Sequence, residues 1–224
     1  SGMSKLYWRR HNGASDEPVD EQHPLPVDVQ SQTFSPAFRG AQVTADYLWR
    51  LGLEGRLFLA SDADQNDLVT GQASFANTTP TFLLSVPAGT TAIPLFVNLS
   101  QTGTVAGGAI DVIIEMAAVD KFSTGGASEG VFNIRSGQRN VNKCLLRSGA
   151  TAFAGYGVRL WGATIGQDVS PAEGAVQGPF WKPELPYFLE GPASLAIFTY
   201  AATTGPTWFW TFGWAEFDTR ELVI

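Results

Sequence analysis

The sequence is short of the side chains on which most enzyme mechanisms depend. Of its 224 residues only two are histidine, His11 and His23, and one is cysteine, Cys144. Because both histidines precede residue 33, the rest of one chain cannot build a Ser-His-Asp triad, a Cys-His pair or a histidine-ligated metal. One cysteine also excludes an intramolecular disulfide and a cysteine-based zinc site. We therefore expect a protein that is not an enzyme and holds no cofactor.

Charge and long apolar runs are also scarce. Charged residues make up 16% of the chain and the net charge is −7. Phosphate binding needs clustered Lys and Arg, so this acidic chain argues against nucleic acid as a partner, and against anionic membrane surfaces for the same reason. No apolar run approaches the ~18 residues that a membrane helix requires. No signal peptide follows Met3, and we expect synthesis in a host cytoplasm with no membrane partner.

Turn formers and aromatic residues are abundant, with 24 Gly, 13 Pro and 7 Trp. Runs of β-type residues alternate with turns rich in Gly, Pro, Asn and Ser. We expect strands at residues 56–60, 81–86, 93–99, 109–116, 155–165, 194–200 and 207–217, and either a strand or a short helix at 43–51. No sustained helical period is present. The pattern predicts an all-β fold, a jelly-roll-like antiparallel β-sandwich that spans residues 33–224 as a single domain.

Residues 1–32 differ from the rest of the chain. Ser1 and Gly2 read as the scar of an expression tag. Residues 12–27 (NGASDEPVDEQHPLPV) contain few apolar side chains, and their prolines favour extended backbone. We expect an extended N-terminal arm that lies on a neighbouring subunit or anchors the protein, the alternative being an ordinary mobile terminus. Tyr7 and Trp8 favour an arm that contacts another surface, because a tail exposed to water gains nothing from two adjacent aromatic rings.

The strongest strand pattern lies at residues 207–217. Side chains alternate across a strand, so Trp208, Trp210, Phe212 and Trp214 share one face. We expect this face to be buried in the core or in a subunit interface, since three exposed tryptophans would form a sticky patch. The opposite face carries small residues and leaves room for a close approach. Trp181 lies in a proline-rich loop, is expected to be exposed, and is the first place to seek a glycan.

Paired carboxylates are the one enzyme chemistry that the composition leaves open. Residues 62–67 (DADQND) begin like a calcium loop, but Asp67 and Ala73 stand where an EF-hand needs Gly and Glu. We expect a polar turn there, with a looser calcium site as the alternative. No motif joins the candidate acids, and we expect them to be solvated, with Glu216 paired to an arginine: they are Asp111, Glu115, Asp120, Glu129, Asp168, Glu173, Glu184, Glu190 and Glu216.

Residues 18–27 (PVDEQHPLPV) resemble the opening of many tailed-phage virion-associated proteins, in which Asn usually stands where this chain has His23. Residues 90–99 and 191–195 resemble strands of environmental phage proteins and are similar to the jelly rolls of viral capsid, decoration and fibre-tip proteins. The resemblance implies a non-enzymatic virion structural protein of the capsid or tail, a homotrimer with other virion proteins as partners. The alternatives are a carbohydrate-binding or receptor-binding module and, after it, a glycan hydrolase with paired carboxylates.

Overall fold

The computed structural model describes residues 7–8, 17–18, 47–62, 68–102, 109–135, 141–165, 180–202 and 205–222. The chain divides into two units, Ser1–Thr44 and Ala45–Ile224. In the first unit, β1 (Tyr7–Trp8) pairs antiparallel with β2 (Glu17–Pro18). The remainder of the expected arm, and the boundary expected after residue 32, lie outside the described residues and stay predictions.

The second unit is built almost entirely of strands. A helix, α1 (Tyr47–Leu53), precedes them and a short 3-10 helix, η2 (Thr219–Leu222), follows the last one. Among the described residues, no helix is long and apolar enough to cross a membrane. The strands are β3 (Leu57–Ser61), β4 (Val69–Thr70), β5 (Phe82–Val86), β6 (Thr90–Thr102), β7 (Ile110–Ala117), β8 (Phe122–Thr124), β9 (Ala127–Ser128), β10 (Val131–Asn133), β11 (Leu145–Ser148), β12 (Thr151–Ala152), β13 (Val158–Ile165), β14 (Phe180–Trp181), β15 (Leu189–Glu190), β16 (Ala193–Ala201) and β17 (Thr207–Asp218).

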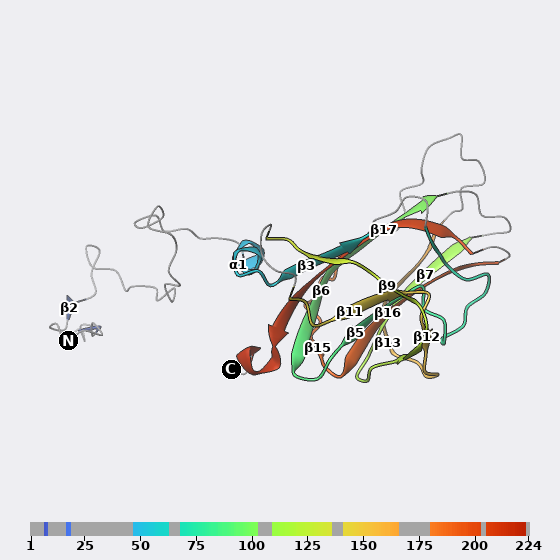
Figure 1. Ribbon diagram of the computed structural model, residues 1–224. Coiled ribbons are helices and arrows are strands. Elements are labelled where there is room, and N and C mark those ends of the chain that lie inside the picture. The colour runs from blue at the N-terminus through green and yellow to red at the C-terminus, as the bar shows by residue number, and fades with distance from the viewer. Residues whose placement is uncertain are drawn as a thin grey trace, which may run out of the picture. The chain divides into compact units, whose positions relative to one another are not determined.

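Two antiparallel sheets lie against each other as a sandwich (Figure 1). The described residues form a seven-stranded sheet in the order β10-β3-β17-β6-β14, with β15 also on β6 and β4 on β17, and a six-stranded sheet in the order β13-β7-β16-β5-β11-β9. Strands β3, β5, β6, β7, β13, β14, β16 and β17 can be numbered one to eight along the chain. Their order is then 1-8-3-6 in one sheet and 2-7-4-5 in the other, which is the jelly-roll arrangement. The expected all-β, jelly-roll-like sandwich is confirmed.

The helical alternative at residues 43–51 is also correct, although the helix begins at Tyr47 and continues to Leu53. Its end is set by Gly55, which has a φ of 73°. The amide of Arg56 donates to the carbonyl of Leu51 at 2.9 Å and that of Gly55 to Gly52 at 3.0 Å. This is a Schellman-type ending, in which a left-handed glycine closes the last turn.

Side chains on the facing sides of the two sheets make the main core, which includes Phe82, Leu146 and Ile197. A second cluster lies on the outer side of the seven-stranded sheet, where α1 covers one end of it through Leu51. A third lies on the outer side of the six-stranded sheet, under Phe75. The described residues therefore pack the inner side of the seven-stranded sheet fully and cover its outer side only in part.

Candidate functional site

The three tryptophans of β17 are buried inside the sandwich, as expected. The ring of Trp210 lies 4.8 Å from that of Phe82 on the opposite sheet, measured between centroids. The indole of Trp208 donates from Nε1 to Oγ1 of Thr199 at 2.9 Å, which ties β17 to β16 across the core. These tryptophans therefore hold the two sheets together and leave no indole face free for a ligand.

The expectation that Trp181 is exposed is wrong. Only 4% of it is accessible, and its ring stacks on Tyr187 with centroids 6.5 Å apart. The reason is the pairing of β14 with β6, which places Trp181 opposite Val97 on the core side and Phe180 opposite Asn98 on the outer side. Because side chains alternate along a strand, Phe180 is exposed instead, at 59%.

Glu216 is buried, and its expected pairing with an arginine is wrong. Its carboxylate accepts hydrogen bonds from the indole Nε1 of Trp214 at 2.8 Å and from the backbone amides of Lys143 at 2.7 Å and Cys144 at 3.2 Å. Burial, followed by the nearby Glu216 charge, raises the pKa of the Cys144 thiol. A thiolate is therefore disfavoured, which suits a structural role for Cys144 rather than a nucleophilic one.

Glu115 is also buried rather than solvated. Its carboxylate accepts the backbone amide of Gly157 at 3.3 Å. The neighbouring Ile114 belongs to the main core, so Glu115 points away from the core whereas Glu216 points into it. These two buried acids therefore do not form the carboxylate pair that a glycan hydrolase needs. Asp168 and Glu173 lie outside the described residues.

The structure describes few of the residues that we expected to bind a metal or to form the N-terminal arm. Within the described parts of the chain, no group of three metal-ligating side chains is found. Asp62 is the only described residue of the candidate calcium loop at 62–67. For Tyr7 and Trp8 only the backbone is described, in β1. His11 and His23 lie outside the described residues, so the metal-site alternative and the arm contact stay predictions.

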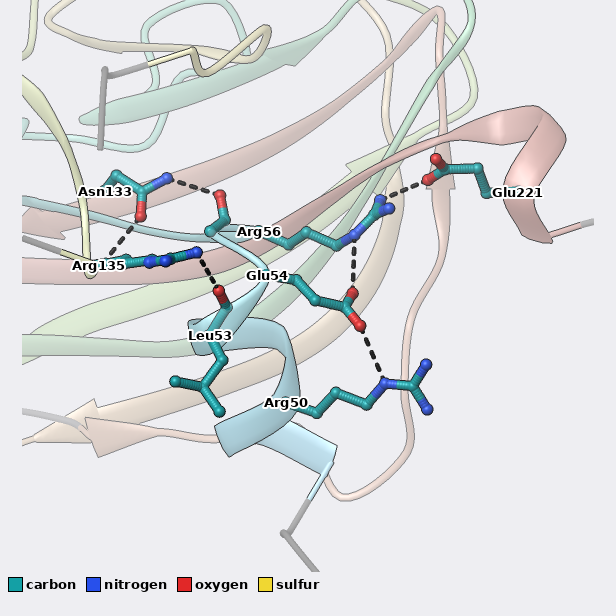
Figure 2. A network of polar contacts seen from close by, with 8 residues as sticks. Arg50, Leu53, Glu54, Arg56, Asn133, Arg135 and Glu221 are labelled. Atoms are coloured by element: carbon teal, nitrogen blue, oxygen red, sulfur yellow. Dashed lines mark hydrogen bonds and ion pairs between the residues drawn. The ribbon is translucent and has the colours of Figure 1, made fainter. Parts of the chain in front are cut away.

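A network of charged and polar groups holds α1 at the rim of the seven-stranded sheet (Figure 2). Glu54 accepts from Nε of Arg50 at 2.9 Å and from Nε of Arg56 at 3.1 Å. Arg56 also pairs with Glu221 of η2 and places its guanidinium 5.3 Å from the ring centroid of Phe217. The helix is thereby joined to the last residues that the structure describes.

The same network reaches α1 from β10. Arg135 donates from Nη1 to the carbonyl of Leu53 at 2.6 Å, and Asn133 donates from Nδ2 to the carbonyl of Gly55 at 2.6 Å (Figure 2). Carbonyls at a helix end have no partner inside the helix, so these two side chains satisfy groups that would otherwise need water. The end of α1 is thus tied to β10 through Asn133, to the residues after β10 through Arg135, and to η2 through Arg56.

Among the described residues, two rows lie on the outer side of the seven-stranded sheet beyond the part that α1 covers. We call them the open rows, and their exposed members are Phe132, Asn98 and Phe180. Directly paired residues of antiparallel strands share a face, so the pairing of β10, β3, β17, β6 and β14 defines both rows. None of the eight residues is charged. The first row is Phe132, Leu59, Gly213 and Phe96, and the second is Ser61, Thr211, Asn98 and Phe180.

Gly213 leaves room in the first row for a ring of the neighbouring strand. A Cβ added to Gly213 would lie 2.5 Å from Cε1 of Phe96, closer than such atoms approach one another in real proteins. The Phe96 ring therefore lies over the glycine, and it stacks on Phe180 with centroids 6.3 Å apart. The close approach expected on the lean side of residues 207–217 is thus made by an aromatic ring of the neighbouring strand.

No protein family model matches the chain, and no curated protein or solved structure matches it. We define the outer face as the two open rows, the exposed side of α1, and Phe209 and Ile134, which lie on the same side of the sheet two residues from Thr211 and Phe132. Its exposed apolar side chains include Trp49 at 73% and Phe132 at 57%. Sequence reasoning missed this surface, and its one signal was the small residues that alternate with the tryptophans at residues 207–217.

Proposed function

We propose that this chain is a non-enzymatic structural subunit that acts by assembling with other subunits, in the virion of a tailed phage. The observation that carries the proposal is the outer face, an uncharged sheet surface with exposed aromatic rings. Apolar patches of this kind on soluble domains mark interaction sites, and charged residues are depleted at the centre of protein interfaces. A surface that stays in contact with water requires neither exposed aromatic rings nor an absence of charge.

The fold supports the virion part of the proposal to a lesser degree. Jelly rolls form the subunits of many viral capsids, and they also form lectin domains, so the fold alone does not fix the function. The resemblance of residues 18–27 to virion-associated proteins favours the first of these uses and implies three copies with other virion proteins as partners. Whether the subunit belongs to the capsid or the tail is part of the same test.

The experiment is immunogold labelling of the purified phage particles whose genome encodes this chain. An antiserum raised against residues 45–224 is expected to label the particles at capsid or tail. Serum from before immunisation is the control. Unlabelled particles, in a lysate where the antiserum detects the free chain, would remove the virion assignment.

A carbohydrate-binding module is the second candidate, and one observation favours it. The exposed ring of Phe180 lies beside Asn98 on the outer face, and sugars bind to aromatic rings flanked by amide groups. A glycan array probed with the whole chain is expected to show hits that disappear with Phe180→Ala. An array without hits would eliminate this candidate.

A further inference from the structure

We propose that the outer face packs against the outer face of a second copy of this chain, with α1 of each copy lying over the open rows of the other. This inference rests on the proposed role in assembly and names the surface and the occupant. It applies to the unit Ala45–Ile224, which contains every residue of the outer face.

The shape of the outer face suits a contact with a second copy. Leu51 buries α1 against Leu57 and Ala215 at one end of the sheet, and the helix stands above the rows that follow. At the centre of those rows the Phe96 ring occupies the space over Gly213. A raised helix beside a lower, open sheet is complementary to itself after a two-fold rotation, which is how isologous interfaces are built.

The exposed apolar area of the outer face approaches that of a stable interface between proteins. Aromatic side chains contribute ~150–250 Å² each when fully exposed, and Leu and Ile contribute about the lower of these values. Six of them on the outer face are about half exposed and together offer roughly 650 Å², against roughly 800 Å² per partner in a standard stable interface. They are Trp49, Leu53, Phe132, Ile134, Phe180 and Phe209.

The distribution of charge also favours a contact through the outer face. Two copies that each carry a net charge of −7 repel one another, so a contact between copies is favoured where charge is absent. The two open rows carry none, whereas the network of Arg50, Glu54, Arg56 and Glu221 lies at the rim. An apolar centre with a charged rim is the usual anatomy of an interface between proteins.

The helix itself supports the same occupant. Leu51 is buried on one side of α1, and Trp49 and Leu53 are exposed on the other. Large apolar side chains on opposite sides of a helix are normally covered on both sides. The polar network holds this helix end in place without covering Trp49, and the second copy supplies the cover.

The test compares the mass in solution of the whole chain with that of four variants, by sedimentation velocity from about 1 to 100 µM, the range of weak to moderate affinities. Asn98→Asp adds one charge to the second row without changing the size of the side chain. Phe180→Glu places a charge beside it. The matched controls are Asn77→Asp and Phe153→Glu, which change the same residue types elsewhere, Phe153 being 60% exposed.

We expect the unaltered chain and both controls to have an even multiple of the mass of one chain, 24.0 kDa: two copies for the pair alone, and six if trimers also form. Both outer-face variants are expected to dissociate at concentrations about tenfold higher or more, because like charges would face each other across the contact. Circular dichroism melts must show that all four variants fold.

An oligomer that survives both outer-face variants, or one that dissociates with Phe153→Glu instead, would overturn this inference and leave the assembly proposal standing. A trimer insensitive to Asn98→Asp would do the same. A single-chain mass for the unaltered protein at every concentration would overturn both this inference and the assembly proposal. Binding of a glycan, or of the chain's own N-terminal residues, to the outer face of a monomer would also overturn both.

Discussion

At the scale of single residues, the Glu216 carboxylate joins segments that are far apart in the sequence. It lies on β17 of the seven-stranded sheet and accepts the amides of Lys143 and Cys144, which lead into β11 of the six-stranded sheet. The third donor is the indole of Trp214. The charge-assisted hydrogen bonds from these three donors offset the free-energy cost of removing the carboxylate from water. The donors in turn rely on the carboxylate as their hydrogen-bond acceptor.

Replacing Glu216 with Gln tests this arrangement. One acceptor oxygen becomes an amide donor that faces another donor, and a buried N–H is left without an acceptor. We expect the free energy of unfolding to fall by about 1–3 kcal/mol, measured by urea denaturation at a matched protein concentration. Glu190→Gln changes an exposed glutamate on β15 and should stay within ~0.5 kcal/mol of the unaltered chain. Equal stability of the two variants would contradict the role of Glu216.

Residue patterns predicted the burial of the β17 tryptophans because alternation over eleven residues is a strong signal. They could not place Glu216, because its backbone donors lie more than 70 residues away in the chain. They misplaced Trp181 because β14 is two residues long. In so short a strand a shift of one residue exchanges the inward and outward side chains, and only the pairing with β6 determines that Phe180 is the exposed one.

At the scale of elements, α1 is a seven-residue helix, which is too short to be stable by itself in water. Its place on the sheet depends on Leu51, which is buried among Leu57, Ile93 and Ala215. The ion pairs around it are partly exposed, and each contributes ~1 kcal/mol or less. The apolar contact therefore supplies most of the stability, and the charged groups determine the orientation of the helix.

Leu51→Ala is accordingly expected to lower the free energy of unfolding by about 2–5 kcal/mol, through lost burial and the cavity left behind. Urea denaturation measures it. Leu185→Ala alters a leucine that is 67% exposed and should change the stability by less than ~0.5 kcal/mol. If Leu51→Ala were as mild as its control, α1 would not be held on the sheet in the way described.

The attachment of η2 is expected to depend on pH. The Arg56 guanidinium, hydrogen-bonded to Glu221, lowers the pKa of that carboxyl below its ordinary value. A carboxyl with a lower pKa in the folded chain stabilises the fold above its unfolded pKa of ~4.3 and loses that contribution as the pH falls through the folded pKa.

The comparison is between the unaltered chain and Glu221→Gln, with the free energy of unfolding measured at several pH values. We expect the unaltered chain to be more stable above about pH 5 and the difference to vanish in stronger acid. A difference that is constant across this range, or one that grows in acid, would mean that the Arg56 pair does not act on η2.

The long strands were predictable and the short ones were not. Residues 81–86, 109–116, 194–200 and 207–217 correspond to β5, β7, β16 and β17 within a residue or two at each end. Strand β6 continues to Thr102 and begins at Thr90, through Pro94. That proline is tolerated because the register with β17 shifts beside it, and a strand that bulges there does not need the missing amide. Strands β10 and β11 have too few residues for a period to be recognised.

At the scale of the whole molecule, the sequence predicted a sandwich because many turn residues separate short apolar runs. It could not predict which side of the seven-stranded sheet is left uncovered, since that depends on where α1 packs. The outer face combines residues from β10, β3, β17, β6 and β14, which are dispersed from residue 59 to residue 213. Only the strand order brings Phe132, Phe96 and Phe180 onto one surface.

If the chain assembles with other copies, its mass in solution must exceed that of one chain. Size-exclusion chromatography with multi-angle light scattering gives that mass without reference to shape. At concentrations of about 10 µM and above, where weak specific interfaces are occupied, we predict a multiple of 24.0 kDa, with two copies as the smallest species. A mass of one chain throughout that range would contradict the account.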